Sequence, residues 1–176
     1  MPSVHSSAVG TSTGADMFLA VRSARAGDIK GEAAATDHAE EIVVHGWNWG
    51  MTQQVAAGLP TGGGGSAGQA GKRRSLRPLT VYKRIDKAST SLMAVLGSND
   101  SVRTAVLSMR KAGEGQQDFF KVTLTDGRVV DLGYAADDHG NVVEQVTFAF
   151  AKIEVEYRPQ SGTGTRGGAS SFAIDA

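Results

Sequence analysis

One stretch near the C-terminal end, residues 141–159 (NVVEQVTFAFAKIEVEYRP), constrains the fold more than any other part of the chain. Apolar side chains alternate with polar ones along it, which is typical of a β-strand with one buried face. The apolar set of the first half is Val146, Phe148 and Phe150, and that of the second half, with opposite parity, is Ile153, Val155 and Tyr157. Because side chains alternate strictly across a strand, one strand on a single-sided sheet cannot change its buried face. Either a bulge intervenes, or the second half buries its apolar face against something else, such as another subunit.

Three earlier stretches also alternate as strands do. They are residues 17–22 (MFLAVR), 40–54 (EEIVVHGWNWGMTQQ) and 75–84 (SLRPLTVYKR). In the second stretch, the alternation predicts one shared face for Val43, His45, Trp47, Trp49 and Met51. In the third stretch, Pro78 has no N–H to donate to a ladder, so it predicts an edge strand or the beginning of a strand.

The middle of the chain contains one predicted helix and one predicted hairpin. Residues 86–97 (DKASTSLMAVLG) have a helical apolar side, with Asp86 as the predicted N-cap and Gly97 placed to end the helix in the left-handed conformation. Residues 117–134 alternate on both sides of Asp126-Gly127, a dipeptide typical of two-residue turns, which predicts a hairpin. Residues 101–111 (SVRTAVLSMRK) fit both a helix and a strand, and periodicity alone does not choose between them.

The two ends and one internal segment differ in composition from the rest. Residues 1–15 and 159–176 are small and polar, which predicts flexible tails around a single domain at residues 16–158. Phe172 and Ile174 offer an alternative for the second tail, in which it docks onto the domain. Residues 55–71 are rich in glycine and predict an extended loop. A chain of 176 residues fits one domain, and the pattern predicts a mainly β domain with one helix.

The Gly-rich loop contains matches to two functional motifs. GGGSAG at 63–68 fits the dinucleotide-binding pattern G-x-G-x-x-G, and GGSAG at 64–68 fits the nucleophile elbow G-x-S-x-G. Both motifs need a helix directly after the loop, whereas residues 72–84 are strand-like and include Pro78. A run of glycines produces such matches by chance. We therefore expect neither a bound nucleotide cofactor nor a nucleophilic Ser66.

Residue usage excludes other chemistries. The chain has no cysteine, which excludes disulfides, Cys-based zinc sites and thiol catalysis. His38 and His45 lie near Asp37, Glu40 and Glu41, and such a group is compatible with metal ligation. His45 falls within an apolar alternation, however, so a structural histidine is favoured over a metal ligand. We expect no catalytic residue, no cofactor and no metal.

Charge argues against two kinds of partner. Lys plus Arg is 18 and Asp plus Glu is 18, whereas a dedicated nucleic-acid-binding protein is usually basic. No apolar run approaches the length of a membrane span or a signal-peptide core. We therefore expect no nucleic-acid partner and no membrane insertion. The basic run that begins at residues 72–74 favours an exposed strand edge guarded by charge, with salt bridges between subunits as a second option.

Five segments together resemble one known family, the tube protein of the type VI secretion system, also called the haemolysin-coregulated protein (Hcp) family. The segments are MFLAVRSARAGDIKGEA, EEIVVHGWNWGMTQQ, LTVYKRIDKASTSLMAVL, VRTAVLSMRKAGEGQQDFFKVTLTDGRVV and EQVTFAFAKIEVEYRPQ. They occur in the family's order and cover roughly residues 17–160. The combination of IDKAS, Trp-x-Trp-Gly and the late Glu-x-Val-x-Phe makes the resemblance specific.

The resemblance implies a two-sheet β-barrel with one flanking helix, and it makes residues 101–111 a strand. It also implies a homohexameric ring, with rings stacked into a tube that a contracting sheath propels out of the cell. The implied partners are other copies of the chain, a tip spike protein, the sheath and effectors carried in the lumen or on the tip. The chain would be cytoplasmic before firing and then secreted without a cleaved signal peptide. The loop at 55–71 would contact the next ring.

These expectations give two sets of candidate residues. The ring-interface candidates are Ile153, Val155, Tyr157, Trp47 and Trp49. The ring-stacking candidates are Gly62, Gly63, Gly64, Gly65, Lys72, Arg73 and Arg74. The alternative function is that of a monomeric β-sandwich module, which would bind a ligand through the Trp-containing strand and the basic loop.

Overall fold

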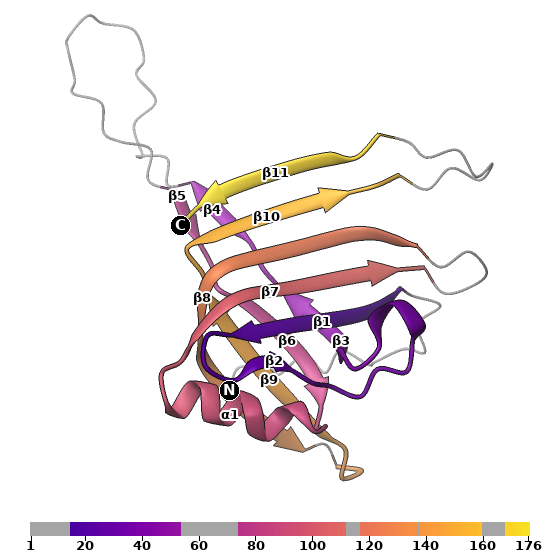
Figure 1. Ribbon diagram of the computed structural model, residues 1–176, viewed down its shortest axis with the longest axis vertical. Helices are drawn as coiled ribbons and strands as arrows, with labels where there is room; N and C mark the ends of the chain where they lie inside the picture. The colour runs from indigo at the N-terminus through magenta and orange to yellow at the C-terminus, as the bar shows by residue number, and fades with distance from the viewer. Residues whose placement is uncertain (1–14, 54–73, 112–116, 137, 160–167) are drawn as a thin grey trace, which may run out of the picture.

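The computed structural model describes residues 15–53, 74–111, 117–136, 138–159 and 168–176. Two layers of antiparallel strands cross each other, and one helix covers one end of the molecule (Figure 1). The elements in chain order are β1 (Asp16–Ser23), β2 (Gly27–Ile29), η1 (Thr36–His38), β3 (Ile42–Asn48), β4 (Met51–Gln53), β5 (Arg74–Leu76), β6 (Leu79–Arg84), α1 (Ala88–Gly97), β7 (Ser101–Arg110), β8 (Asp118–Ala136), β9 (Val142–Ala149), β10 (Lys152–Tyr157) and β11 (Ser170–Asp175).

The strands close into a barrel. The order is β11-β10-β8-β7-β1-β3-β6-β9, and β9 pairs back onto the second half of β8. β4 and β5 form a separate two-stranded sheet beyond the barrel. The prediction of a mainly β, two-sheet barrel with one flanking helix is confirmed, and residues 101–110 are a strand, as the resemblance implied.

Both layers contribute side chains to one core. Leu19 of β1, Leu107 of β7 and Leu124 of β8 face Val81 of β6 and Phe148 of β9, and all five are at most 1% exposed. Each fully buried apolar side chain of this size stabilises the fold by about 1.5–3 kcal/mol. In β1, β6, β8 and β9, the alternation of apolar residues therefore indicates which side of the strand faces the core.

β8 is one long strand that belongs to both layers, and the predicted hairpin at Asp126-Gly127 is wrong. Residues before this dipeptide pair with β7 and β10, and residues after it pair with β9. Asp126 has φ 51°, which turns the strand from one layer into the other. A Cβ on Gly127 would lie only 2.5 Å from the carbonyl oxygen of Ala149, so the corner needs glycine.

A second corner explains the change of buried face in residues 141–159. The stretch is two strands, β9 and β10, separated at Phe150 and Ala151. The Ala151 N–H donates to the carbonyls of Thr125 and Asp126, so this corner lies against the corner in β8. Phe148 before the break and Ile153 after it are buried in the same core. Of the two alternatives, a local irregularity accounts for the pattern, and burial against another subunit is not needed to explain it.

The predicted shared face of residues 40–54 is also wrong. Ile42 and Val44 are buried, whereas Val43 is 37% exposed and His45 is exposed. The register with β6 shifts between Val44 and Gly46, so the strand returns its next large side chain, Trp47, to the core side. Pro78 directly precedes β6, which confirms that it marks the beginning of a strand.

The beginning of α1 is tied to the barrel by a buried charged network. Lys83 of β6 and Glu144 of β9 are fully buried, and Lys83 Nζ lies 2.5 Å from Glu144 Oε2. Lys83 Nζ also lies 2.8 Å from Asp86 Oδ1, and Ser89 Oγ donates to Glu144 Oε2. Asp86 Oδ1 accepts the Ala88 N–H at 3.0 Å, but the N-cap position is Lys87, one residue after the predicted N-cap.

The end of α1 differs from the prediction. Gly97 is the last helical residue, and Asn99, with φ 51°, adopts the left-handed conformation. The N–H of Asp100 donates to the carbonyl of Val95, which satisfies one carbonyl of the last turn. Asparagine tolerates this conformation better than most other residues, which is why it replaces glycine there.

The C-terminal end also differs from the prediction, because residues 170–175 are not a flexible tail. They form β11, which pairs along the whole of β10. The alternative of docking through Phe172 and Ile174 is the one the structure shows: Phe172 lies opposite Val155, and Ile174 packs against the core. Residues 1–14 of the predicted N-terminal tail (1–15) and the whole of the predicted Gly-rich loop (55–71) fall outside the described residues.

Candidate assembly surface

An apolar face continues from the core onto the surface of β10 and β11. Cross-strand pairing places Ile153 opposite Ile174 and Val155 opposite Phe172, all on the side of the sheet that faces the core. Exposure increases along this side, from 0% for Ile153 to 46% for Tyr157 and 45% for Phe172. We call Val155, Tyr157 and Phe172 the β10–β11 face. Its outer part leaves two aromatic side chains in solvent, at the end of the molecule where Figure 1 shows β10 and β11.

Two further aromatic residues, Phe120 and Trp47, pack next to this face. Tyr157 lies opposite Phe120 of β8, and the rings of Phe120 and Trp47 are 6.0 Å apart at 25°. Trp47 and Trp49 are half-buried against the core. The Trp49 Nε1 atom is buried and has no acceptor among the described residues. The structure thus places Trp47 next to Phe120, and Phe120 next to Tyr157 of the β10–β11 face.

The ring-interface candidates therefore differ in what they can do. Ile153 is buried inside its own subunit, so its inclusion as a contact residue is corrected: its side chain belongs to the core. Val155 is half-buried and Tyr157 is exposed, so both remain candidates. Phe120, which lies opposite Tyr157, was not among the predicted interface candidates. The alternation of residues 118–124 around it was a usable signal, but it was assigned to a hairpin.

Of the ring-stacking candidates, only Arg74 is described. It is exposed on β5, which pairs with β4 at the base of the Gly-rich segment. Gly62, Gly63, Gly64, Gly65, Lys72 and Arg73 lie outside the described residues. Their role stays a prediction.

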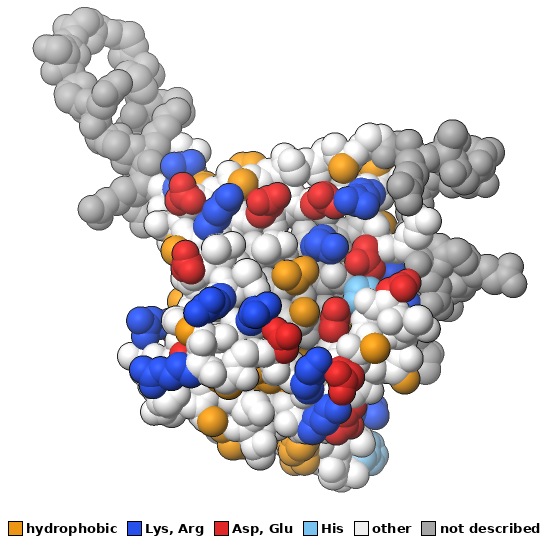
Figure 2. All heavy atoms as spheres, viewed as in Figure 1, with side chains coloured by type: hydrophobic (Ala, Val, Ile, Leu, Met, Phe, Trp, Pro, Cys, Tyr) orange, Lys and Arg blue, Asp and Glu red, His pale blue; other side chains and the backbone are white. Residues whose placement is uncertain are grey.

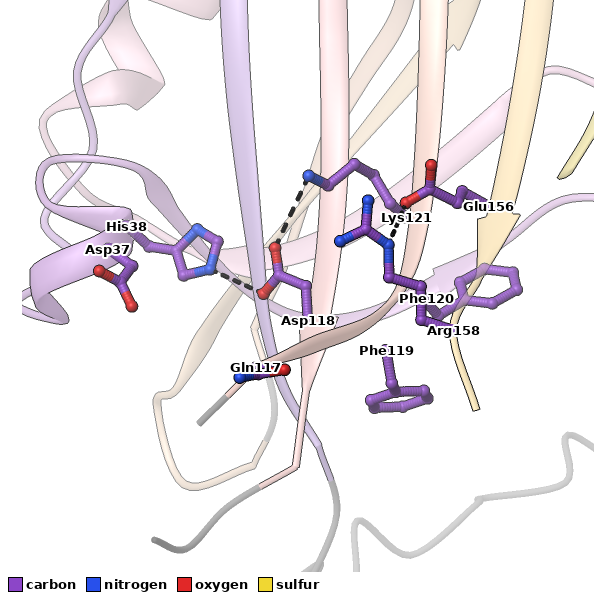
Figure 3. Close-up of a pocket in the computed structure, with 9 residues that line it drawn as sticks. All are labelled: Asp37, His38, Gln117, Asp118, Phe119, Phe120, Lys121, Glu156 and Arg158. Atoms are coloured by element: carbon purple, nitrogen blue, oxygen red, sulfur yellow. Dashed lines mark hydrogen bonds and ion pairs between the residues drawn. The ribbon is translucent and has the colours of Figure 1, made fainter. Parts of the chain in front are cut away.

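A charged pocket of about 280 Å³ lies beside η1, where β8 begins and β10 ends (Figure 3). His38, 6% exposed, has Nδ1 2.9 Å from Glu41 Oε2 and Nε2 3.0 Å from Asp118 Oδ1. Its ring stacks on Phe18 at 4.4 Å. His38, rather than His45 for which the prediction was made, is a structural histidine, because both its ring nitrogens have carboxylate partners and the ring is packed.

The pocket lining fits a structural role better than a catalytic one. Lys121 pairs with Asp118, and Arg158 pairs with Glu156 at 2.8 Å, so its charges largely neutralise one another (Figure 3). Among the residues that the structure describes, the lining contains no Ser, Thr or Cys side chain that His38 could activate as a nucleophile. The described residues give no positive evidence of catalysis. The expectation that the protein is not an enzyme stays a prediction.

His45 does not lie in a packed face, contrary to the prediction. Its side chain is exposed on β3, yet partial burial of the ring and then the nearby Arg84 guanidinium lower its pKa. The imidazole is therefore neutral at pH 7. No group of three or more potential metal-ligating side chains occurs among the described residues.

The surface around these features is mixed in charge. Figure 2 shows Lys and Arg side chains interspersed with Asp and Glu over the layer that contains β1, β7, β8 and β10, with few apolar side chains between them. A face of this kind offers no single-sign field for a nucleic-acid backbone. In the part of the chain that is described, no helix is both long and apolar enough to span a membrane.

A closed barrel with a surface of mixed charge and an exposed aromatic face at one end defines a class: a β-barrel protein with a surface suited to protein–protein contact. Comparison with known proteins gives the family. Residues 18–157 match the family model described as "Type VI secretion system effector, Hcp". The chain belongs to this Hcp family.

Two relatives and one solved structure illustrate the likeness. Protein hcp1 of Pseudomonas aeruginosa is 36% identical over 157 residues, which cover 87% of this chain and 89% of the relative. The "Major exported protein" of the same organism is 27% identical over 152 residues, covering 80% and 83% of the two chains. The crystal structure of Hcp1 from Salmonella typhimurium has a TM-score of 0.69 at 26% identity and covers 92% of this chain and 94% of that one.

Proposed function

We propose that this protein is the structural tube subunit of a type VI secretion system. It forms homohexameric rings that stack into a tube, and the tube is exported with effectors, the tip spike protein and a contracting sheath as partners. The chain is cytoplasmic before firing and leaves the cell without a cleaved signal peptide. Family membership supports the system, and the name "Major exported protein" of one relative supports export.

The observation that carries the assembly proposal is the exposed β10–β11 face. Tyr157 and Phe172 are both nearly half exposed although they continue the apolar side of the core sheet. Aromatic residues are enriched at the centres of protein interfaces, and exposed aromatic patches mark such sites. A stable ring contact needs to bury on the order of 1,200–2,000 Å², so this face is the centre of a larger contact. Val155 and Tyr157 are its candidates from the original set, with Trp47 and Trp49 as support.

The stacking of rings rests on the Gly-rich segment and its basic flank. We assign this role to residues 55–71 together with Lys72, Arg73 and Arg74. A glycine-rich segment loses more conformational entropy than others when it becomes ordered, so stacking contacts are weaker than the contacts within a ring.

The test of the ring is the mass of the purified protein by light scattering, with negative-stain imaging of the same sample. Tyr157→Glu is expected to give monomers, because a charge would be buried without a partner at the contact. Met93→Glu is the matched control: Met93 is 43% exposed on α1, away from this face, and the variant should keep the hexamer mass. A wild-type monomer at high concentration would contradict the ring and return attention to a monomeric ligand-binding module.

A further inference from the structure

The imidazole ring of His38 lies between two carboxylates that come from different parts of the chain. Its Nδ1 atom is 2.9 Å from Oε2 of Glu41, and its Nε2 atom is 3.0 Å from Oδ1 of Asp118, the first residue of β8. The residue is buried, and its ring stacks on Phe18 of β1. The Nε2 contact therefore joins η1 to a strand that begins 80 residues later in the chain.

The two contacts need a hydrogen on each ring nitrogen. An ionised carboxylate only accepts hydrogen bonds, whereas a neutral imidazole has one N–H group and one nitrogen lone pair. In either neutral form of His38, one contact is therefore lost and the other no longer has a charged donor. The imidazolium form donates to both carboxylates, and hydrogen bonds between charged groups are stronger than neutral ones. The link between η1 and β8 therefore depends on the second proton of His38.

The other charged groups around the ring come from several elements. Arg110 of β7 contacts the Phe18 ring at 4.9 Å and lies 3.5 Å from Asp16. Lys121 lies 3.8 Å from Oδ2 of Asp118, which is the oxygen that does not contact His38. The remaining groups in the same pocket are Asp37 of η1 and the paired Glu156 and Arg158. Among the described residues, the polar partners of the two ring nitrogens are therefore both carboxylates.

The segment that carries His38 has few buried side chains. Within residues 30–41, Gly31, Ala33 and His38 are buried, and most of the others are exposed. Backbone hydrogen bonds fold this segment onto itself, for example from the Glu40 N–H to the Ala33 carbonyl at 3.0 Å. Segments with little buried apolar surface open most readily from the native state. Loss of the His38 contacts should therefore increase the population in which this segment is open.

We propose that His38 is a proton-operated clasp. It holds residues 30–41 against the beginning of β8 when both ring nitrogens carry a hydrogen, and it loosens when one hydrogen is lost. Histidine is the side chain whose charge ordinarily changes between about pH 5 and pH 8. The charged pocket of Figure 3 lies at the same contact, so opening of the segment would also enlarge this pocket. All contacts that carry the proposal lie within one subunit, so it does not rest on the proposed ring.

Hydrogen exchange of the wild-type protein tests the clasp. Protection factors, corrected for the intrinsic effect of pH on exchange, are measured for the hydrogen-bonded amides of His38, Glu40 and Glu41. The two conditions are about pH 8 and about pH 5, where carboxylic acids ordinarily remain mostly ionised. We expect protection about tenfold higher at the lower pH, the order of change that one charge-assisted hydrogen bond gives. Equal protection at both pH values would overturn the clasp.

NMR of nitrogen-labelled histidine shows which group carries the proton. A neutral His38 beside a protonated carboxylic acid would make the same two contacts. The nitrogen chemical shifts distinguish an imidazolium from a neutral ring, and His38 is recognised by its proximity to Phe18. An imidazolium at the lower pH supports the clasp. A neutral ring at that pH, with protection still raised, would assign the proton to a carboxylate and overturn the role of His38.

Asp118→Asn separates the proton from the contact. An asparagine side chain can donate its NH₂ group to the lone pair of a neutral imidazole, so His38 could keep both contacts without a second proton. We expect the pH dependence of protection to disappear in this variant, with the segment still protected at about pH 8. The matched control is His45→Gln, which removes an exposed histidine on β3 and should keep the wild-type pH dependence.

A pH dependence that persists in Asp118→Asn, or that is lost in His45→Gln, would show that His38 is not its source. These measurements follow single amides and do not require a particular oligomeric state. A wild-type monomer would therefore contradict the proposed ring and leave the clasp standing, whereas a ring with protection that does not depend on pH would do the reverse.

Discussion

At the scale of single residues, the most demanding site is the buried pair of Lys83 and Glu144. Both side chains are fully buried, and Asp86, Ser89 and Tyr134 supply further partners. Removing charges from water is costly, and the cost is recovered only when hydrogen bonds satisfy the remaining atoms. These residues link β6, β8 and β9 to the helix, so the network fixes where the helix begins.

Glu144→Gln should lower the free energy of unfolding by about 3 kcal/mol, the lower end of the range for breaking a buried ion pair, because Asp86 still faces Lys83. Chemical denaturation monitored by tryptophan fluorescence measures the change. The control is Glu40→Gln, which breaks the exposed contact with Lys30 and should change stability little. Equal effects of the two substitutions would show that burial does not set the strength of the Lys83 pair.

The hydroxyl of Tyr134 should titrate late. Its ring is 41% exposed, but the hydroxyl donates to Oε1 of the buried Glu144 at 3.1 Å. Burial, and then the negative charge of Glu144, raise the pKa of Tyr134 to about 12. A raised folded-state pKa means that the contribution to stability is complete below about pH 10, the unfolded value, and is lost as pH rises towards 12.

Alkaline titration by tyrosinate absorbance checks this pKa. The wild type should show one late transition near pH 12 that is missing in Tyr134→Phe. The variant should also lose less stability than the wild type between pH 10 and pH 12. A late transition that persists in Tyr134→Phe would belong to another tyrosine.

At the scale of elements, the two corners decide the fold. β8 turns at Asp126-Gly127, the chain between β9 and β10 turns at Phe150-Ala151, and backbone hydrogen bonds join the corners. Because of these corners, one chain segment can serve both layers, and the outer strands β10 and β11 extend beyond the closed part of the barrel.

Gly127→Ala should destabilise the protein by about 1–3 kcal/mol, since the added methyl group would overlap the backbone carbonyl of Ala149. Gly97→Ala is the matched control. It adds the same methyl group at a helical position with open space, and it should be neutral or stabilising by up to about 1 kcal/mol. Thermal and denaturant unfolding of both variants measure the difference. A tolerated Gly127→Ala would mean that the corner can widen.

The same corners mark the limit of what the sequence could predict. Local alternation was enough for β1, β6 and β9, and a helical apolar side was enough for α1, because those signals depend on near neighbours. The dipeptide Asp126-Gly127 is compatible both with a hairpin turn and with a corner inside one strand. Only the approach of Ala149, far along the chain, makes it a corner. The bulge at Gly46 and the pairing of β11 with β10 likewise depend on distant strands. The β10–β11 face was partly predictable, through Val155 and Tyr157, whereas the position of Phe120 beside Tyr157 needed the sheet register.

At the scale of the whole molecule, one layer carries interspersed basic and acidic side chains (Figure 2), whereas the apolar side of β10 and β11 leaves Tyr157 and Phe172 exposed. A chain with equal numbers of basic and acidic residues has little electrostatic repulsion between copies. Association of copies would then be governed by this apolar side.

If only folded subunits associate into the ring, the thermal midpoint of unfolding should rise with protein concentration, because association stabilises the native state by mass action. Differential scanning calorimetry over a hundredfold range of concentration measures this. Tyr157→Glu should have a midpoint that does not depend on concentration. A wild-type midpoint that is equally independent would contradict ring formation in that range.

The place of β1 in the barrel has a consequence for biosynthesis. β1 leaves the ribosome well before β7, but Met17 pairs with Met109 of β7, so this partner is made much later than β1. Until β7 is made, Phe18 and Leu19 have backbone partners only on the β3 side, where they lie opposite Val43 and Ile42. Contacts between residues as far apart in sequence as β1 and β7 form slowly. Each nascent chain therefore passes through an interval in which the β7 side of β1 is an open strand edge, where a strand of a neighbouring chain could pair.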